Sequence, residues 1–373
     1  MADTWTVTAV ARVPTTGSPI FSELGALYCA ISFDEGLNEA GTATLSMNVR
    51  TVTENIKARL RDLSAAPMEV WIYKNSTMQF AGPVTGGSVQ GQVLSLTARG
   101  ILFYTDYMHV ETDKTFAAVD EWTVATELIS DWQSQNYGDY GIDTSGVGTS
   151  GTTMSIVIPG ASEFPKVLET IKGMSVGRFD ISVDPTTRAL TLEASKGSDL
   201  SASVFLDIGI ESADINFAVT PGIVASEVYG VGTNAAGSPL TTTKTNSTIE
   251  ATFGKAGHTE SFDPVTDATH LSDLTDGDLA KREGQLFVPG AGLIGVPGAT
   301  LDDFGVGDTV TYSFDAGLGL QTFAARIARR SVTIDEAGVE RIAVQFGTPV
   351  KDQVEIMAEI RGDIKKLKTQ ATR

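Results

Sequence analysis

Apolar and polar residues alternate along much of the first hundred residues, which is the period-two pattern of strands that bury one face. The pattern is clearest between residues 68 and 107, where Met68, Val70 and Ile72 share one face of their segment. Asn, Ser, Gly and Pro separate the runs and supply turns. We therefore predict three consecutive strands here. Their apolar face needs a second layer or closure of the sheet on itself.

Further alternating runs precede this meander, so the first unit has about six strands, enough for a small antiparallel barrel or sandwich. The next hundred residues change to helical patterns. An acid-led helix is predicted at 120–132, and a second helix is predicted to be capped by Ser162 and to bury Phe164. A hairpin with a proline turn follows at 179–192.

Strand patterns return after residue 211 and end in a closing hairpin, with a short helix predicted at 271–283. The sequence thus predicts a mainly β (α+β) chain. We expect a first β-barrel, a small α/β insert, a second β-barrel and a C-terminal amphipathic helix, in that order, at residues 1–108, 109–210, 211–348 and 349–373.

The last segment carries an apolar heptad, interrupted by Gly362. Its a and d positions are the candidate oligomerisation residues: Val350, Gln353, Met357, Ile360, Ile364 and Leu367. Two interpretations stay open. The helix either associates with copies of itself in a coiled coil or docks on its own domain.

Composition narrows the class of protein. A length of 373 residues allows two or three domains at roughly 100–200 residues each. A net charge of −19 argues against a surface that wraps nucleic acid, and fits either simple solubility or a channel wall past which a polyanion slides. The single cysteine, Cys29, lies in an apolar run and is expected to be a small buried side chain.

Targeting signals are not evident in the sequence. No apolar run approaches the ~18–20 residues of a membrane span. The N-terminus has neither the basic region nor the apolar region of a secretory signal, so we expect assembly in a cytoplasm.

The sequence contains partial matches to nucleotide-binding and metal-binding motifs, but the flanking elements or the spacing of the residues do not fit such sites. The run Gly146–Gly151 matches G-x-G-x-x-G, but a strand and not a helix is predicted after it, so no phosphate site is expected. The histidines, His109, His258 and His270, lack metal-ligand spacing, and the acids around residues 263–278 do not fit an EF-hand. We predict no catalytic residue, no cofactor and no metal site.

Three arginines, Arg326, Arg329 and Arg330, lie in the closing hairpin. They belong either to an ordinary solvated strand face or to pairs with acids of a neighbouring subunit.

One stretch resembles a known family. A strand, a short turn, the run Phe80-Ala-Gly82-Pro83-Val84 and a second strand ending in Arg99-Gly100-Ile-Leu102 are similar to the minor tail (tail hub) proteins of long non-contractile-tailed phages of actinobacteria. These are relatives of the baseplate hub protein of contractile phages. The helix, strand and hairpin of the insert are similar as well, and Gly307-Asp308-x-Val310 resembles a strand entry near the end of such hubs.

The resemblance implies a homotrimer in which each chain gives two tube-type β-barrels, so that three copies form a pseudo-sixfold ring. Such a ring joins the sixfold tail tube to threefold tip proteins. The implied partners are a distal tail ring protein, the tape measure protein and further tip or fibre proteins. Genomic DNA would transit the lumen without specific binding. The implied location is the virion tail tip, after assembly in the host cytoplasm.

Two alternatives belong to other classes. The first is a tail-borne cell-wall hydrolase, which turnover of peptidoglycan would reveal. The second is a carbohydrate-binding adhesin, which glycan binding would reveal.

Overall fold

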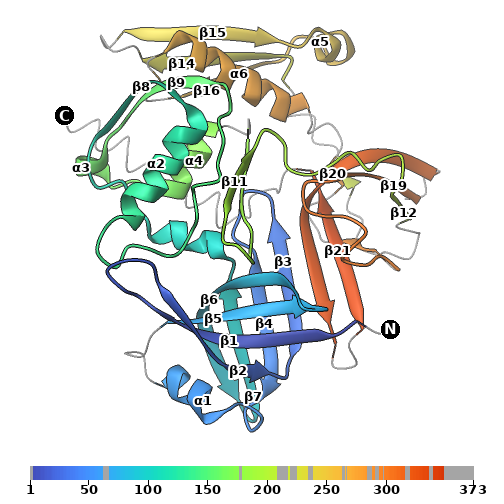
Figure 1. Ribbon diagram of the computed structural model, residues 1–373. Coiled ribbons are helices and arrows are strands. Elements are labelled where there is room, and N and C mark those ends of the chain that lie inside the picture. Colours follow the sequence, from blue (N-terminus) through green and yellow to red (C-terminus); the bar gives the residue numbers. More distant parts are fainter. Residues whose placement is uncertain are drawn as a thin grey trace.

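The computed structural model describes residues 3–61, 67–175, 179–207, 217–218, 225–233, 238–262, 265, 267–283, 288–289, 294–296, 298–315, 320–335 and 339–347. Three regions are visible in Figure 1. A large sheet lies at the bottom and right, a helical region lies beside it, and a small three-stranded sheet with a helix lies at the top.

The N-terminal region supplies most strands of the large sheet. Its elements are β1 (Trp5–Val13), β2 (Ile20–Leu27), β3 (Ala30–Gly36), β4 (Thr42–Asn48), α1 (Glu54–Arg61), β5 (Met68–Lys74), β6 (Thr77–Gln90), β7 (Val93–Arg99) and the 3₁₀ helix η1 (Ile101–Tyr107). The predicted meander is confirmed, because β5, β6 and β7 pair antiparallel in succession. The first half of β6 pairs with β5 and the second half with β7, so this strand turns the corner of the sheet.

The insert follows with β8 (Lys114–Asp120), α2 (Glu121–Gln133), β9 (Thr153–Ile158), α3 (Gly160–Glu163), α4 (Val167–Ser175), β10 (Asp180–Val183) and β11 (Leu190–Glu193). The helix predicted at 120–132 is confirmed as α2, and the hairpin as β10–β11. The prediction for the second helix is wrong in detail. Phe164 precedes a proline, which disfavours the helical conformation, and it breaks the segment into α3 and α4. Its side chain is 54% exposed and not buried.

The remaining elements fall into two groups. The small sheet and its neighbours comprise β14 (Glu227–Thr233), β15 (Pro239–Thr245), α5 (Ser247–Phe253), β16 (Gly257–Ser261) and α6 (Ala268–Glu283). We call β14–β16 with α6 the upper lobe. The strands that extend the large sheet are β12 (Phe205–Asp207), β18 (Ile294–Gly295), β19 (Thr309–Asp315), β20 (Leu320–Ile334) and β21 (Glu340–Phe346), and a short pair is made by β13 (Phe217–Ala218) and β17 (Val288–Pro289). The helix predicted at 271–283 is confirmed within α6.

The prediction of a mainly β chain is confirmed, but that of two closed barrels is not. Among the described residues, the large sheet has the open order β12-β19-β20-β3-β4-β7-β6-β5-β1-β2, with β21 beside β20. The strand β3 would have to pair with β2 to close the first ring. It pairs instead with β20. The edge of β3 that would close the ring is therefore occupied by a strand from the C-terminal part of the chain.

Two hydrophobic cores follow from this topology. The first lies on the inner face of the large sheet and combines N-terminal residues such as Phe33 and Leu96 with C-terminal residues such as Tyr312 and Phe346. The second lies between the outer face of β5, η1 and the insert, around Tyr104 and Ile171. The sheet is therefore covered on both faces where the insert docks.

Candidate functional site

The residues that carry the family resemblance form the corner of β6. Phe80 is buried in the first core, and a Cβ atom added at Gly82 would lie 1.8 Å from the carbonyl oxygen of Arg99. The backbone N–H of Gly100 donates to the carbonyl of Gly41 over 2.7 Å. Close approach of two backbones requires a residue without a side chain. The motif is thus a packing device.

A buried carboxylate joins the sheet to the insert. Glu69 on β5 is fully buried. It accepts hydrogen bonds from the Tyr104 hydroxyl at 2.6 Å and the Trp71 indole N–H at 3.0 Å, and it pairs with Arg188 at 3.1 Å. Arg188 lies before β11 and also donates to the carbonyl of Tyr140 over 2.7 Å. We call Glu69, Tyr104, Arg188 and Tyr140, with Arg12, the Glu69 node.

Aromatic rings extend the node. Tyr104 and Tyr140 stack with their centroids 4.7 Å apart, and the guanidinium carbon of Arg12 lies 5.0 Å and 4.8 Å from the two rings. Burial and the adjacent Glu69 carboxylate raise the pKa of Tyr104, so the phenol stays neutral and acts as a donor. The node therefore holds the insert against β5 of the large sheet.

Charged side chains also attach the C-terminal strands. Arg330 pairs with Glu35 at 2.7 Å, Arg329 pairs with Glu39, and Arg326 pairs with Asp180. Within the chain, their partners are acids on β3, on the β3–β4 turn and on β10. The interpretation as a solvated strand face is wrong for Arg330, which is buried, and pairing with a neighbouring subunit stays a prediction. The strand β20 lies beside β3, which brings the partners within reach.

Three further ionic contacts, all made by Lys74, lie at the other end of the same sheet. Lys74 at the end of β5 is 3% exposed and lies 3.2 Å from Glu340 on β21 and 3.0 Å from Asp302. Asp3 is 3.3 Å from the same ammonium group. Two strands far apart in sequence are thus joined by charge as well as by their core.

One cleft of about 350 Å³ lies between the β3–β4 hairpin, η1 and β10. Its lining includes the acidic residues Asp34, Glu35 and Glu193, the basic residue Lys196 and the apolar residue Leu102. Burial raises the pKa of Asp34, although the backbone N–H of residue 42 opposes the shift.

The G-x-G-x-x-G run is a loop that binds the chain itself. The backbone N–H groups of Ser150 and Gly151 donate to the carboxylate of Asp120, which also caps α2 through the N–H of Trp122. Burial alone would raise the pKa of Asp120, but these hydrogen bonds outweigh it and lower the pKa. The predicted strand follows as β9. The donors that a phosphate would need are therefore used internally.

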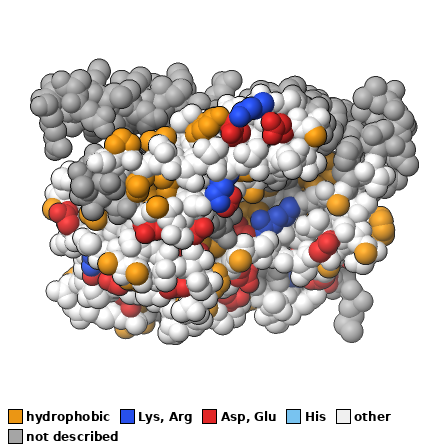
Figure 2. Space-filling view, turned by 90° about the horizontal axis from the view of Figure 1, so that it is seen from above, with side chains coloured by type: hydrophobic (Ala, Val, Ile, Leu, Met, Phe, Trp, Pro, Cys, Tyr) orange, Lys and Arg blue, Asp and Glu red, His pale blue; other side chains and the backbone are white. Residues whose placement is uncertain are grey.

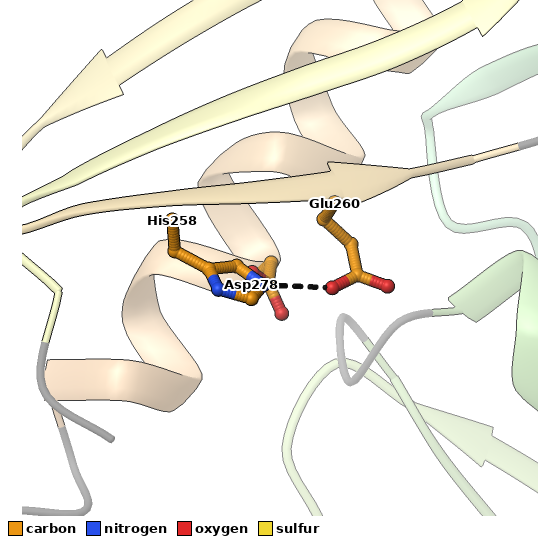
Figure 3. Close-up of side chains that lie close together, drawn as sticks. All are labelled: His258, Glu260 and Asp278. Atoms are coloured by element: carbon orange, nitrogen blue, oxygen red, sulfur yellow. Dashed lines mark hydrogen bonds and ion pairs between the residues drawn. The ribbon is translucent and has the colours of Figure 1, made fainter. Parts of the chain in front are cut away.

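The histidines have separate surroundings. The Nδ1 atom of His109 lies 3.2 Å from the carbonyl of Tyr107, and His270 is buried in α6. His258 is different, because its Nε2 atom lies 3.0 Å from Glu260. Figure 3 shows both on β16, with Asp278 of α6 beside them. Spacing between histidines does not reveal this cluster, because only one of its members is a histidine. The signal available in the sequence was the pair His258 and Glu260, which are alternate residues of one strand.

Ligand atoms of His258, Glu260 and Asp278 all lie within 4.8 Å of one another. Arg282, one turn further along α6, donates from Nε to Asp278 over 2.7 Å and from Nη2 to Glu260 over 3.4 Å. The side chain of Asp278 is 11% exposed, whereas those of His258 and Glu260 are 36% and 40% exposed. The cluster is thus anchored on the helix and open to solvent at the strand.

The six heptad residues lie outside the described residues, so the oligomerisation prediction stays a prediction. In the part of the chain that the structure describes, no helix combines the length and the apolar character needed to cross a bilayer.

Comparisons with known proteins identify the fold. No protein-family model matches the sequence, and no curated protein matches it. Solved structures do match over nearly the whole chain. A tail protein from Neisseria meningitidis MC58 aligns with 94% of this chain and 98% of its own, at 15% identity and a TM-score of 0.60. Prophage tail protein gp18 from Listeria monocytogenes EGD-e aligns with 96% and 99%, at 14% identity and a TM-score of 0.61.

The chain has the fold of a phage tail protein. The 43 kDa tail protein of prophage MuSo2 from Shewanella oneidensis agrees, with 93% of this chain and 99% of its own aligned, at 13% identity and a TM-score of 0.59. Coverage this complete on both sides means that the large sheet, the insert and the upper lobe belong to one shared architecture. Identities this low establish the fold alone.

Proposed function

We propose that the protein is a structural component of the phage tail tip, a trimeric hub ring between the sixfold tail tube and threefold tip proteins. One observation carries the proposal: three phage tail proteins share the fold over at least 93% of this chain and 98% of theirs. The resemblance at the β6 corner supports the hub role in particular. In the fold, this corner is a turn at which two backbone segments approach closely, and this close packing explains why the motif contains glycine.

In this ring each chain contributes two tube-type β units, residues 1–108 and 211–348, with the insert 109–210 outside them. The shared sheet and the pairs Arg330–Glu35 and Lys74–Glu340 support the idea, because they hold the two units as one body within a subunit. Among the described residues, β2 and β12 are edge strands of the large sheet, and these edges would meet neighbouring copies, since strand edges favour association. The ring's partners are a distal tail ring protein, the tape measure protein and tip or fibre proteins.

The test of the ring is the mass of the purified protein. We expect light scattering to give about three times the chain mass of 39.3 kDa, and negative-stain images to show threefold rings with a central pore. A monomer at every concentration, without rings after addition of a tail-tube protein, would overturn the hub role. Turnover of peptidoglycan by the purified chain would overturn it in favour of a hydrolase.

We propose further that the heptad ties three chains together below the ring. Replacing Ile360 and Ile364 with Asp places charge at d and a positions and should weaken the trimer. The matched control is Lys365→Ala with Lys366→Ala, at positions outside the a/d seam, which should leave the mass unchanged. An unchanged mass after deletion of residues 350–373 would show that the trimer does not need the heptad.

The net charge of −19 supports an acidic lumen that DNA passes without binding. On the face seen in Figure 2, acidic side chains are spread widely and basic ones are visible in only a few places. A basic or neutral bore in the assembled ring would contradict this part of the proposal. The measurement is retention of the ring on immobilised duplex DNA at low salt, which we expect to be absent.

A further inference from the structure

The upper lobe has little apolar core. Among the described residues, its two hydrophobic clusters contain four and three buried side chains, respectively, while the core of the large sheet contains 29. The contact between α6 and the sheet depends on Leu271, Leu274 and Leu279, together with few others. Small cores in other proteins are commonly supplemented by a disulfide or a structural metal. The only cysteine of the chain, Cys29, lies in a different region, between β2 and β3.

The cluster on β16 and α6 offers the chemistry of a metal site at this position. His258 and Glu260 alternate on β16 and so project from the same face, and Asp278 approaches from α6 (Figure 3). One imidazole nitrogen and two carboxylates are ligands that zinc and similar divalent ions accept at about 2.0–2.2 Å. Ligand atoms then lie roughly 3.3 Å apart, so atoms within 4.8 Å need only rotamer adjustments.

Arg282 has two opposing effects on the binding of a metal ion at this cluster. Its guanidinium binds one oxygen of Asp278 closely, at 2.7 Å, while the other oxygen is 3.5 Å away. The short hydrogen bond orients the carboxylate, while the oxygen with the long and therefore weak contact is the one that can turn to an ion. The positive charge of Arg282 nevertheless opposes a dication. Two carboxylates and one guanidinium leave a net charge of −1 at the cluster when the imidazole is neutral.

We propose that His258, Glu260 and Asp278 bind one divalent transition-metal ion, which joins β16 to α6 and stabilises the upper lobe. The strand side of the cluster is open enough for the ion to enter and for water to complete its coordination. Calcium and magnesium prefer sites built from oxygen alone, so the imidazole selects against them.

The test is titration of the full chain, freed of metal by a chelator, with Zn²⁺ in a calorimeter. We expect one ion per chain and a rise in the melting temperature of the transition that involves the upper lobe, because a ligand that binds only the folded state stabilises it. Mg²⁺ at the same concentration should have no such effect.

Variants separate this site from adventitious binding. His258→Ala and Asp278→Asn should each abolish the one-ion step, whereas His109→Ala, which removes a histidine elsewhere, should leave it unchanged. Arg282→Gln deletes the opposing charge and should tighten binding about tenfold. The proposal is overturned if the wild-type chain binds no Zn²⁺, or if His258→Ala binds as well as the wild type. Circular dichroism of each variant shows that loss of binding is not loss of fold.

Discussion

Glu69 offers the sharpest test of how the insert is held on the sheet. Its carboxylate is fully buried and pairs with Arg188 across the contact between β5 and the β10–β11 hairpin. Glu69→Gln leaves the Arg188 charge without its partner in a buried place. Removal of one member of a buried pair costs about 3–5 kcal/mol of unfolding free energy. Arg188→Met should cost a similar amount, because it leaves the carboxylate uncompensated.

The double variant distinguishes a true pair from two separate losses. With both charges removed, the desolvation penalty disappears together with the attraction, so the double variant should be more stable than the sum of the single effects by about 2 kcal/mol. The assay is urea unfolding followed by the total tryptophan fluorescence. Trp71, whose indole N–H donates to Glu69, is one of the four tryptophans that contribute to this signal.

The control is Glu54→Gln, which breaks the exposed pairs with Lys57 and Arg61 on α1 and should change stability little. Additive single effects, or losses no larger than that of the control, would refute the inference that the Glu69–Arg188 pair joins the insert to the sheet.

Three further outcomes follow from the structure. Gly82→Ala should cost about 3 kcal/mol, because its Cβ would overlap the carbonyl of Arg99, while Gly17→Ala meets no atom within 4 Å and should be neutral in urea unfolding. Burial raises the pKa of Cys29 to about 12, so little thiolate is present at pH 8 and iodoacetamide should label the folded chain more slowly than the unfolded chain. Labelling of the folded chain at the rate of a free cysteine would contradict this. Asp120→Ala should cost about 1 kcal/mol of cap stabilisation. The pKa of Asp120 is lowered in the folded state, so its contribution to the free energy of unfolding is present above the unfolded pKa of about 3.9 and is lost as pH falls through the lower native value. The stability difference between wild type and variant should therefore shrink at low pH. A constant difference down to about pH 2 would refute this.

Much of the local structure was evident in the sequence. Strand periodicity located the β5–β7 meander, and an acidic N-cap with an apolar stripe located α2. These signals are local, since the residues that report them are a few positions apart. The same reasoning failed at Phe164, where the restriction imposed by the next proline outweighed an apolar spacing.

The candidate metal cluster could be predicted from the sequence only in part. His258 and Glu260 form a strand-spaced pair that a search for alternating ligands would find. Asp278 is 18 positions after Glu260 in the sequence. Only the packing of α6 against β14 and β15 brings it close, because β16 pairs with β14. The sequence pattern does not specify which helix residue will pack beside which strand of the sheet.

The sequence by itself located the β5–β7 meander, α2, most of α6 and the closing hairpin, and the resemblance to tail hub proteins pointed to a phage tail fold. Tertiary structure alone decided that β3 pairs with β20 and not with β2, so that the large sheet stays open and both ends of the chain share one core. The partners of Arg329 and Arg330 follow from that single pairing. The physical reason is that alternation specifies which face of a strand is buried, whereas the choice of a neighbour about 300 residues away depends on the combined packing of every strand in the sheet.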